Sequence, residues 1–225
     1  MPRHRPPGLP AAALLAVGPA DPHCNKAIVM KISCYGDPIL RKKAIPVAEI
    51  TPEIKELAKE MLQTMYEADG VGLAAEQIGR TEAICVIDVP AESQGAEYVA
   101  LQAGIRMPMV LINPKVSELE GTQRGSEGCL SFPKIFAPVT RALCCRVDYM
   151  GLDGKHYSVK TYGLLARAVQ HEVDHLNGIV FVDHFSATQS LVFKGRLAKL
   201  ARASRGGEPP RANGEPPQPQ HGEER

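Results

Sequence analysis

Residues 170–178 read Gln-His-Glu-Val-Asp-His-Leu-Asn-Gly, a run that contains the His-Glu-x-x-His spacing of a helical metal site. On a helix, His171 and His175 lie about 40° apart around the axis and roughly 6 Å apart along it, so both imidazoles can reach one ion. Glu172 can then act on a water molecule bound to that ion. The run therefore predicts a helix held inside the domain, with a metal on one of its faces.

Steps of 100° per residue divide this helix into three faces. One stripe holds Leu164, Ala168, His171 and His175, a second holds Leu165, Val169, Val173 and Leu176, and a polar flank holds Arg167, Gln170 and Asp174. Two of the three faces are therefore predicted to be buried. Glu172 falls between the first two stripes, where burial raises the pKa of a carboxyl and suits it to proton exchange near neutral pH. Asp174 is predicted to support the site, and its pairing with an arginine such as Arg141 is a hypothesis.

The five-residue pattern also occurs in proteins that bind no metal, so a third ligand is needed to make the prediction specific. The chain contains six cysteines, Cys24, Cys34, Cys85, Cys129, Cys144 and Cys145. Their irregular spacing is not that of a disulfide scaffold, and 225 residues can bury a core without staples, so a reducing compartment is expected. Cys129 differs from the others because it lies in Gly-Ser-Glu-Gly-Cys-Leu-Ser at 125–131, where glycine permits close backbone approach to a ligand.

Two further motifs accompany the histidine run, Gly-Val-Gly-Leu-Ala-Ala-Glu-Gln at 70–77 and Glu-Gly-Cys-Leu-Ser at 127–131. Together, and in this order, the three motifs resemble those of the peptide deformylase family, whose members remove the formyl group from the N-terminal formylmethionine of new polypeptides. Three concordant motifs are far more specific than one. The resemblance implies a hydrolase that releases formate and an α+β fold, in which antiparallel or mixed β-sheets surround a central metal-binding helix.

Carried over residue by residue, the resemblance implies that Cys129, His171 and His175 bind one divalent ion and that Glu172 is the general acid and base. Two imidazoles and one thiolate would satisfy zinc as readily as iron, so the spacing does not choose the metal. The family implies Fe2+ as the physiological ion, with Zn2+, Ni2+ or Co2+ able to occupy the same site. Because an iron–thiolate pair is open to oxidation, activity is predicted to be lost in air, more slowly with nickel or cobalt.

The resemblance also assigns Gln77 and the backbone N–H of Leu130 to the formyl oxygen, on which negative charge develops. Loss of one such donor typically costs about 100- to 1,000-fold in rate. The predicted substrate-binding residues are Gly70, Val71, Gly72, Leu130 and Leu164. The glycines would let the substrate backbone lie beside this segment as an added β-strand, and the apolar side chains are candidates for the methionine pocket. Residues 132–138 depart from the family, since they contain no arginine where some members have a basic residue near 136 that contacts substrate.

Hydrophobic patterning predicts the elements around the motif helix. Thr51 and Pro52 can cap and begin a helix that stops before Gly70. Apolar runs at 83–89, 108–113 and 143–150 are predicted strands, and the motif helix follows from about Tyr162. Helix, strands and then helix favour an α+β domain over alternating parallel units. Strands that carry Gln77 and Cys129 are expected to converge on the motif helix.

One catalytic domain at 30–203 is expected between two irregular ends. Residues 1–29 are interpreted as a disordered extension or a start assigned upstream of Met30, although no acid precedes Asp21 and an organelle transit peptide is the alternative. Residues 204–225 are predicted to be disordered. A bacterial-type cytoplasmic location is expected, or organellar import if the first segment is a transit peptide. No stretch is long enough to span a membrane, and neither membrane nor DNA is an expected partner.

A last helix is predicted at about 187–203, and its charged residues Lys194, Arg196, Lys199 and Arg202 are all basic. One interpretation is a solvated helix face. The other, implied by the family, is electrostatic attachment to ribosomal RNA, close to where formylmethionyl nascent peptides emerge. The formal net charge of the chain is only +1, so such a contact would be local.

Two other classes of protein would use the same motif helix. A zinc peptidase would usually take its third ligand downstream, where the nearest candidates are Asp183 and His184. A noncatalytic metal-binding module would tolerate Glu172→Gln without consequence. The Cys129 motif favours the deformylase.

Overall fold

The computed structural model describes residues 29–206, so the proposed N-terminal extension and C-terminal tail lie almost entirely outside it. Its helices are α1 (Pro52–Glu67), α2 (Ala96–Leu101), α3 (Gly163–Leu176) and α4 (Ala187–Arg205). The strands are β1 (Gly72–Ala74), β2 (Ile84–Ile87), β3 (Met109–Glu120), β4 (Gln123–Gly128), β5 (Phe136–Arg141), β6 (Cys144–Met150) and β7 (His156–Tyr162). Short 3-10 helices are η1 (Pro38–Arg41), η2 (Ala75–Ile78), η3 (Ala91–Ser93) and η4 (Phe181–His184).

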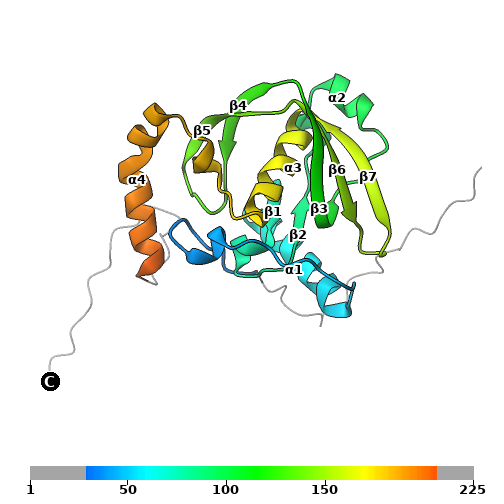
Figure 1. Ribbon diagram of the computed structural model, residues 1–225, viewed down its shortest axis with the longest axis horizontal. Helices are drawn as coiled ribbons and strands as arrows, with labels where there is room; N and C mark the ends of the chain where they lie inside the picture. Colours follow the sequence, from blue (N-terminus) through cyan, green and yellow to red (C-terminus); the bar gives the residue numbers. More distant parts are fainter. Residues whose placement is uncertain (1–28, 207–225) are drawn as a thin grey trace, which may run out of the picture.

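The strands form two antiparallel sheets with α3 between them (Figure 1). The larger sheet has five strands in the order β1-β2-β3-β6-β7, and the smaller one is the β4–β5 hairpin. This arrangement confirms the predicted α+β fold with sheets around a central helix. It confirms the three predicted strands as β2, β3 and β6, and shows that β3 runs seven residues beyond the predicted limit of 113.

Helix α1 begins where its sequence predicts. Thr51 accepts a hydrogen bond from the backbone N–H of Ile54 at 3.4 Å, and Pro52 occupies the first turn, where its missing N–H costs nothing. Helix α1 packs against β1 and β2. Its buried residues are Leu57, Ala58, Met61, Thr64 and Met65. The cap, the proline and the apolar spacing all lie within the helix's own sequence, which is why they are sufficient to predict where α1 begins.

Helix α3 buries more than its two predicted faces. Leu165, Val169 and Leu176 join the core beneath the five-stranded sheet. Arg167, expected on a solvated polar flank, is only 6 % exposed because the β4–β5 hairpin covers that flank. The two strands of the hairpin are distant from α3 in sequence, so the helical periodicity of α3 carries no information about them.

The prediction that Gln77 and Cys129 lie on strands is wrong. Gln77 lies in η2, and Cys129 follows the end of β4. The side-chain oxygen of Gln77 accepts the N–H of Ala74 at 2.8 Å, which closes a turn and ends β1 after three residues. The backbone oxygen of Cys129 accepts the N–H of Phe132 at 2.8 Å, which turns the chain away from β4. Turns at both positions still direct these residues toward α3.

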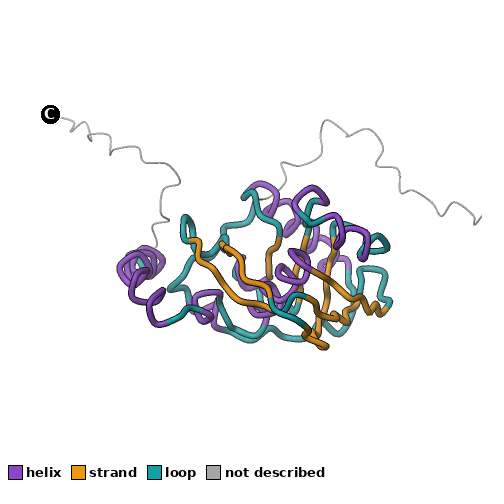
Figure 2. Tube along the Cα trace, turned by 90° about the horizontal axis from the view of Figure 1, so that it is seen from above, coloured by secondary structure: helices purple, strands orange, loops and turns teal. Residues whose placement is uncertain are grey.

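Helix α4 lies at one end of the molecule, and Figure 2 shows it end-on at the edge of the fold. It packs through Phe193, Leu197 and Leu200 against a cluster that includes Phe132 and Phe181. The helix runs two residues beyond its predicted end. Within residues 29–206, no helix combines the length and apolar character that a membrane crossing requires.

Candidate metal centre

Three side chains from the second and third motifs meet beside α3. One nitrogen or sulfur atom from each of Cys129, His171 and His175 lies within 4.8 Å of the other two. The Nε2 atom of His175 is 3.3 Å from the sulfur of Cys129. Both histidines come from α3, and the cysteine comes from the turn after β4, so the cluster joins the small sheet to the central helix. The predicted ligand set is therefore brought together.

The donor chemistry of this cluster fits a divalent transition metal. His171 directs Nδ1 at the Oε2 atom of Glu127, 3.1 Å away, which leaves its other nitrogen for an ion. Burial lowers the pKa of His175 well below its usual value and keeps it in the neutral form that binds metal. For His171, burial acts downward but hydrogen bonds with Cys129 and Glu127 outweigh it and raise the pKa. The site therefore favours a positive charge among Cys129, His171 and Glu127, and a metal ion would supply one.

Glu127 connects the metal ligands to two buried arginines. Its Oε1 atom accepts from Nε of Arg141 at 2.9 Å and from NH1 of Arg167 at 2.7 Å. Its Oε2 atom accepts from NH2 of Arg141 at 3.1 Å. Burial alone would raise the pKa of Glu127, but hydrogen bonds with His171 and Arg141 hold it far below its usual range. Glu127 is thus a fixed anion that orients His171.

The sequence left the role of Glu127 open, and neither the burial of Arg167 nor its hydrogen bond with Glu127 was predicted. A signal was present, because Arg167 interrupts an otherwise small and apolar stretch of α3, and buried charges need partners. The hypothetical pair of Arg141 with Asp174 is confirmed, with NH1 of Arg141 at 2.5 Å from Oδ2 of Asp174.

Glu172 lies against β1, with its carboxylate over Gly72. A Cβ atom at position 72 would overlap that carboxylate, so glycine is required here for the approach of Glu172 itself. Glu172 is 4 % exposed, and its Oε2 atom lacks a hydrogen-bond partner within the described part of the chain. Burial raises the pKa of Glu172 to about 7. The residue is a buried base with one oxygen free for a reacting group.

Gln77 approaches from η2 with its amide N–H groups toward the cluster. Its Nε2 atom lies 3.4 Å from the sulfur of Cys129 and 3.3 Å from Oγ of Ser131. Its own oxygen is held by the N–H of Ala74, so the orientation of the amide is fixed. Gln77 therefore presents donors, and not its acceptor, to the centre.

A cavity of about 770 Å³ opens over these groups. Among its lining residues are the predicted Gly70, Val71, Gly72, Gln77, Cys129, Leu130, Leu164, His171 and Glu172. Lys134 also lines it, two residues before the position at which some family members have a basic residue. The sequence prediction considered only arginine and overlooked this lysine, whose left-handed backbone, with φ of 61°, sets the direction of the turn.

The downstream residues considered for a zinc peptidase lie elsewhere. The carboxylate of Asp183 pairs with Arg41, with NH2 and Oδ1 2.9 Å apart. The Nε2 atom of His184 lies 2.8 Å from Oδ2 of Asp174. Within residues 29–206, the cluster that could hold a metal contains Cys129 and neither of these residues.

Comparisons with known proteins agree with the motifs. The sequence profile of the family described as polypeptide deformylase matches residues 29–190. The chain is 40 % identical to the peptide deformylase of Alkalilimnicola ehrlichii over 177 residues, covering 79 % of this chain and 93 % of that relative. It is also 40 % identical to the peptide deformylase of Nitrosococcus oceani over 176 residues, covering 78 % and 98 %.

Solved structures of peptide deformylases share the fold. The crystal structure from Thermus thermophilus matches with a TM-score of 0.68 and 36 % identity, covering 79 % of this chain and all of that one. The crystal structure from Thermotoga maritima matches with a TM-score of 0.62 and 38 % identity, covering 71 % of this chain and 99 % of that one.

Proposed function

Because the chain belongs to the polypeptide deformylase family, we propose that Cys129, His171 and His175 hold the metal ion of its active site. The enzyme is a hydrolase that removes the N-formyl group from nascent polypeptides. The observation that carries the site assignment is the approach of the three ligand atoms to within 4.8 Å, beside the buried Glu172. The catalytic domain is proposed to span 30–203.

A divalent ion at these ligands would lower the pKa of a bound water molecule toward neutrality and polarise the formyl carbonyl. We propose Fe2+ as the physiological ion, with Zn2+, Ni2+ and Co2+ able to bind the same donors. The test compares Fe2+-loaded and Ni2+-loaded enzyme kept in air. Faster loss of activity in the iron form is expected, because an iron–thiolate pair is oxidised readily. Equal half-lives would contradict the prediction.

Glu172 is proposed as the general acid and base. Its free Oε2 atom accepts a proton from the attacking water, and the same carboxyl then delivers that proton to the departing amine nitrogen. A pKa of about 7 supports both transfers, since neither protonation state is strongly favoured at neutral pH. The bonds change in balance: the carbon–oxygen bond to water forms, the carbon–nitrogen bond breaks, one proton of the water ends on the amine, and the formic acid ionises to formate by releasing the other.

Gln77 and the backbone N–H of Leu130 are proposed to donate hydrogen bonds to the formyl oxygen. The fixed amide of Gln77 supports this role, because a donor that is already oriented costs no reorganisation during the reaction. One hydrogen of Nε2 would remain on Ser131, and the other, which lies near the sulfur of Cys129, would be available to the formyl oxygen.

The methionine side chain is proposed to enter the apolar part of the cavity, lined by Val71, Leu130 and Leu164. Gly70 and Gly72 would lie beside the peptide backbone of the substrate in the manner of an added strand. Lys134 lines the same cavity, and we propose that it contacts peptide groups beyond the methionine, in place of the missing arginine.

The decisive test is the release of formate from formyl-Met-Ala-Ser by wild type and Glu172→Gln under anaerobic conditions, with cleavage of the unformylated peptide as comparison. Formate release by wild type, and its loss in a Glu172→Gln variant that still binds metal, would support the proposal. Peptide-bond cleavage without formate release would indicate the zinc peptidase. Equal rates in both proteins would remove Glu172 from the mechanism.

The exposed basic side chains of α4 are proposed to attach the enzyme to ribosomal RNA. The enzyme would then act where formylmethionyl chains are made, in a bacterial-type cytoplasm, or in an organelle if residues 1–29 serve as a transit peptide. Co-sedimentation with ribosomes should fall as salt rises and in Lys194→Glu/Lys199→Glu. The control Lys55→Glu/Lys59→Glu changes the same charge on α1. Salt-insensitive binding, or equal binding by both variants, would contradict the proposal.

A further inference from the structure

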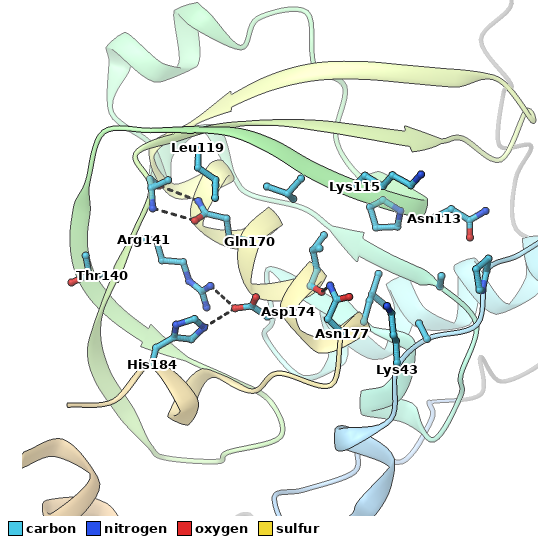
Figure 3. A pocket seen from close by; sticks show the side chains of 18 of the residues that line it. Lys43, Asn113, Lys115, Leu119, Thr140, Arg141, Gln170, Asp174, Asn177 and His184 are labelled. Carbon is cyan, nitrogen blue, oxygen red and sulfur yellow. Dashed lines mark hydrogen bonds and ion pairs between the residues drawn. The ribbon is translucent and has the colours of Figure 1, made fainter. Parts of the chain in front are cut away.

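A second cavity, of about 990 Å³, is lined by Gln170 and Asp174 of α3 (Figure 3). At one end of it, Arg141, Asp174 and His184 are joined by hydrogen bonds, as the dashed lines in Figure 3 show. The metal ligands do not line this cavity, whereas Glu127 and His171 line the catalytic one. The ion pair of Arg141 with Glu127 therefore crosses the wall between the two cavities.

A continuous chain of hydrogen bonds leads from the second cavity to a metal ligand. His184 lies 2.8 Å from Oδ2 of Asp174, and the same oxygen is 2.5 Å from NH1 of Arg141. Arg141 donates a hydrogen bond to each oxygen of Glu127, at 2.9 and 3.1 Å. Glu127 then holds Nδ1 of His171 at 3.1 Å. Each link involves a charged group, so each is among the stronger hydrogen bonds that proteins form.

The chain becomes more buried toward the metal site. The side chain of His184 is 33 % exposed and that of Asp174 is 22 % exposed, whereas those of Arg141 and Glu127 are each 4 % exposed. His184 is thus the most exposed member, whereas Arg141 and Glu127 are buried, where the loss of a hydrogen-bond partner is costly. Removal of the outer hydrogen bond would leave Asp174 free to rotate toward the cavity and would loosen its hold on Arg141.

The two oxygens of Glu127 share Arg141 but differ in their second partner, which is Arg167 for Oε1 and His171 for Oε2. Arg167 binds Oε1 alone, so it does not contact the oxygen that orients His171. That oxygen, Oε2, is shared by His171 and NH2 of Arg141. A rotation of Arg141 would therefore move the acceptor of His171, even with Arg167 in place.

We propose that His184 is a positioning residue for His171, acting through Asp174, Arg141 and Glu127, and that it controls how firmly His171 holds the metal ion. The inference rests on the proposed assignment of His171 as a ligand. Loss of a direct hydrogen-bond partner of a metal-binding histidine typically weakens metal affinity about 10- to 100-fold. Because three hydrogen-bonded residues lie between His184 and His171, loss of His184 is expected to weaken metal affinity by only about 3- to 10-fold.

The test measures release of Co2+ to a chelator and the visible absorption of the Co2+ form, which reports ligand geometry. His184→Phe removes the donor and keeps a ring, whereas His184→Gln retains an N–H. His184→Phe should release Co2+ about 3- to 10-fold faster with an altered spectrum. His184→Gln should lie closer to wild type. His156→Phe, an exposed histidine on β7, is the matched control and should behave as wild type.

A double-mutant cycle with Asp174→Asn tests whether the effect travels along the chain. Once Asp174 is changed, His184→Phe should add little, because the two residues act through one link. Additive effects, or an unchanged Co2+ release rate and spectrum in His184→Phe, would overturn the inference. Thermal unfolding of the metal-free variants separates positioning from general destabilisation, since equal melting temperatures are expected. A wild type that binds no Co2+ would instead overturn the ligand assignment.

Discussion

Glu76 is a buried carboxyl that the proposed reaction does not use. Both of its oxygens are enclosed and lack a hydrogen-bond partner within residues 29–206. Burial raises its pKa to about 8, and the nearby carboxylate of Glu172 acts in the same direction. The folded protein therefore holds Glu76 in its neutral form, whereas the unfolded chain releases the proton near its ordinary pKa of about 4.3.

This difference predicts that Glu76→Gln stabilises the protein in a pH-dependent way. Stability that depends on the neutral carboxyl is complete below the unfolded pKa and is lost as pH rises toward the folded value of about 8. Over that interval, wild type should lose about 1.4 kcal/mol per pH unit relative to Glu76→Gln. Urea unfolding at pH 5 and pH 8 measures the change, with the exposed Glu49→Gln as control. A difference that does not vary with pH would contradict it.

Gly72 carries a second prediction at the residue scale. Since a Cβ atom there would overlap the carboxylate of Glu172, Gly72→Ala should displace the proposed base while leaving the fold intact. A displacement of about 1 Å at a reacting group typically costs about 100-fold in rate. Steady-state assays of kcat and circular dichroism would report both effects. Gly104→Ala, whose Cβ would meet open space, is the control, and equal kcat for the two variants would refute the argument.

The sequence predicts the role of a single residue where the residue belongs to a recognised motif. It does not predict a role that depends on contact with a residue distant in sequence. Cys129, His171 and His175 converge as expected. The clash that requires glycine at 72 could not be foreseen, because it depends on how α3 packs on β1. The same holds for Glu76, which resembles a surface residue until η2 turns it inward.

At the scale of elements, Arg167 fastens the β4–β5 hairpin to α3. Its NH1 group donates to Glu127 and, at 3.0 Å, to the backbone oxygen of Val139 in β5. Its NH2 group is 3.4 Å from the backbone oxygen of Gln123 in β4. One guanidinium therefore joins both strands of the hairpin to the helix that carries the histidines.

We expect Arg167→Met to destabilise the protein by about 3–5 kcal/mol, because it leaves buried acceptors without their donor. Arg167→Lys should recover only part of this loss, since an ammonium cannot reproduce the forked geometry. Urea denaturation of both variants gives the free energy of unfolding. Arg124→Lys and Arg124→Met, at an exposed site on β4, are matched controls. A fully stable Arg167→Met would show that the hairpin is held by apolar contacts alone.

Helices were easier to predict than the hairpin, for a physical reason. The capping and periodicity of α1 are local, whereas β4 and β5 contain polar and glycine-rich stretches whose pairing appears only in register, with Gln123 opposite Arg141. Their buried positions depend on α3 and on the aromatic cluster around Phe132. The sequence predicted the chemistry at the end of β4 and a strand carrying Cys129, but it did not predict the partner strand β5 or the hairpin that the two strands form.

At the scale of the whole molecule, the proposed ion joins two parts of the fold. His171 and His175 belong to α3, which packs on the five-stranded sheet, whereas Cys129 follows strand β4 of the hairpin (Figure 1). Arg141 and Arg167 add ion pairs between these parts. Metal binding and the packing of the hairpin on α3 should therefore be thermodynamically coupled.

This coupling predicts that metal removal loosens the hairpin more than the rest of the fold. Ni2+ at 100 times its dissociation constant should stabilise the folded protein by about 2.7 kcal/mol, and chelation should reverse the gain. Hydrogen exchange should show the largest loss of protection in β4, β5 and the turn at 129–131, with little change in α1. Cys129→Ser serves as control, because it should reduce the Ni2+-dependent gain. Uniform loss of protection across both sheets would mean that the ion stabilises the domain as one cooperative unit, and an unchanged melting temperature would separate metal binding from folding altogether.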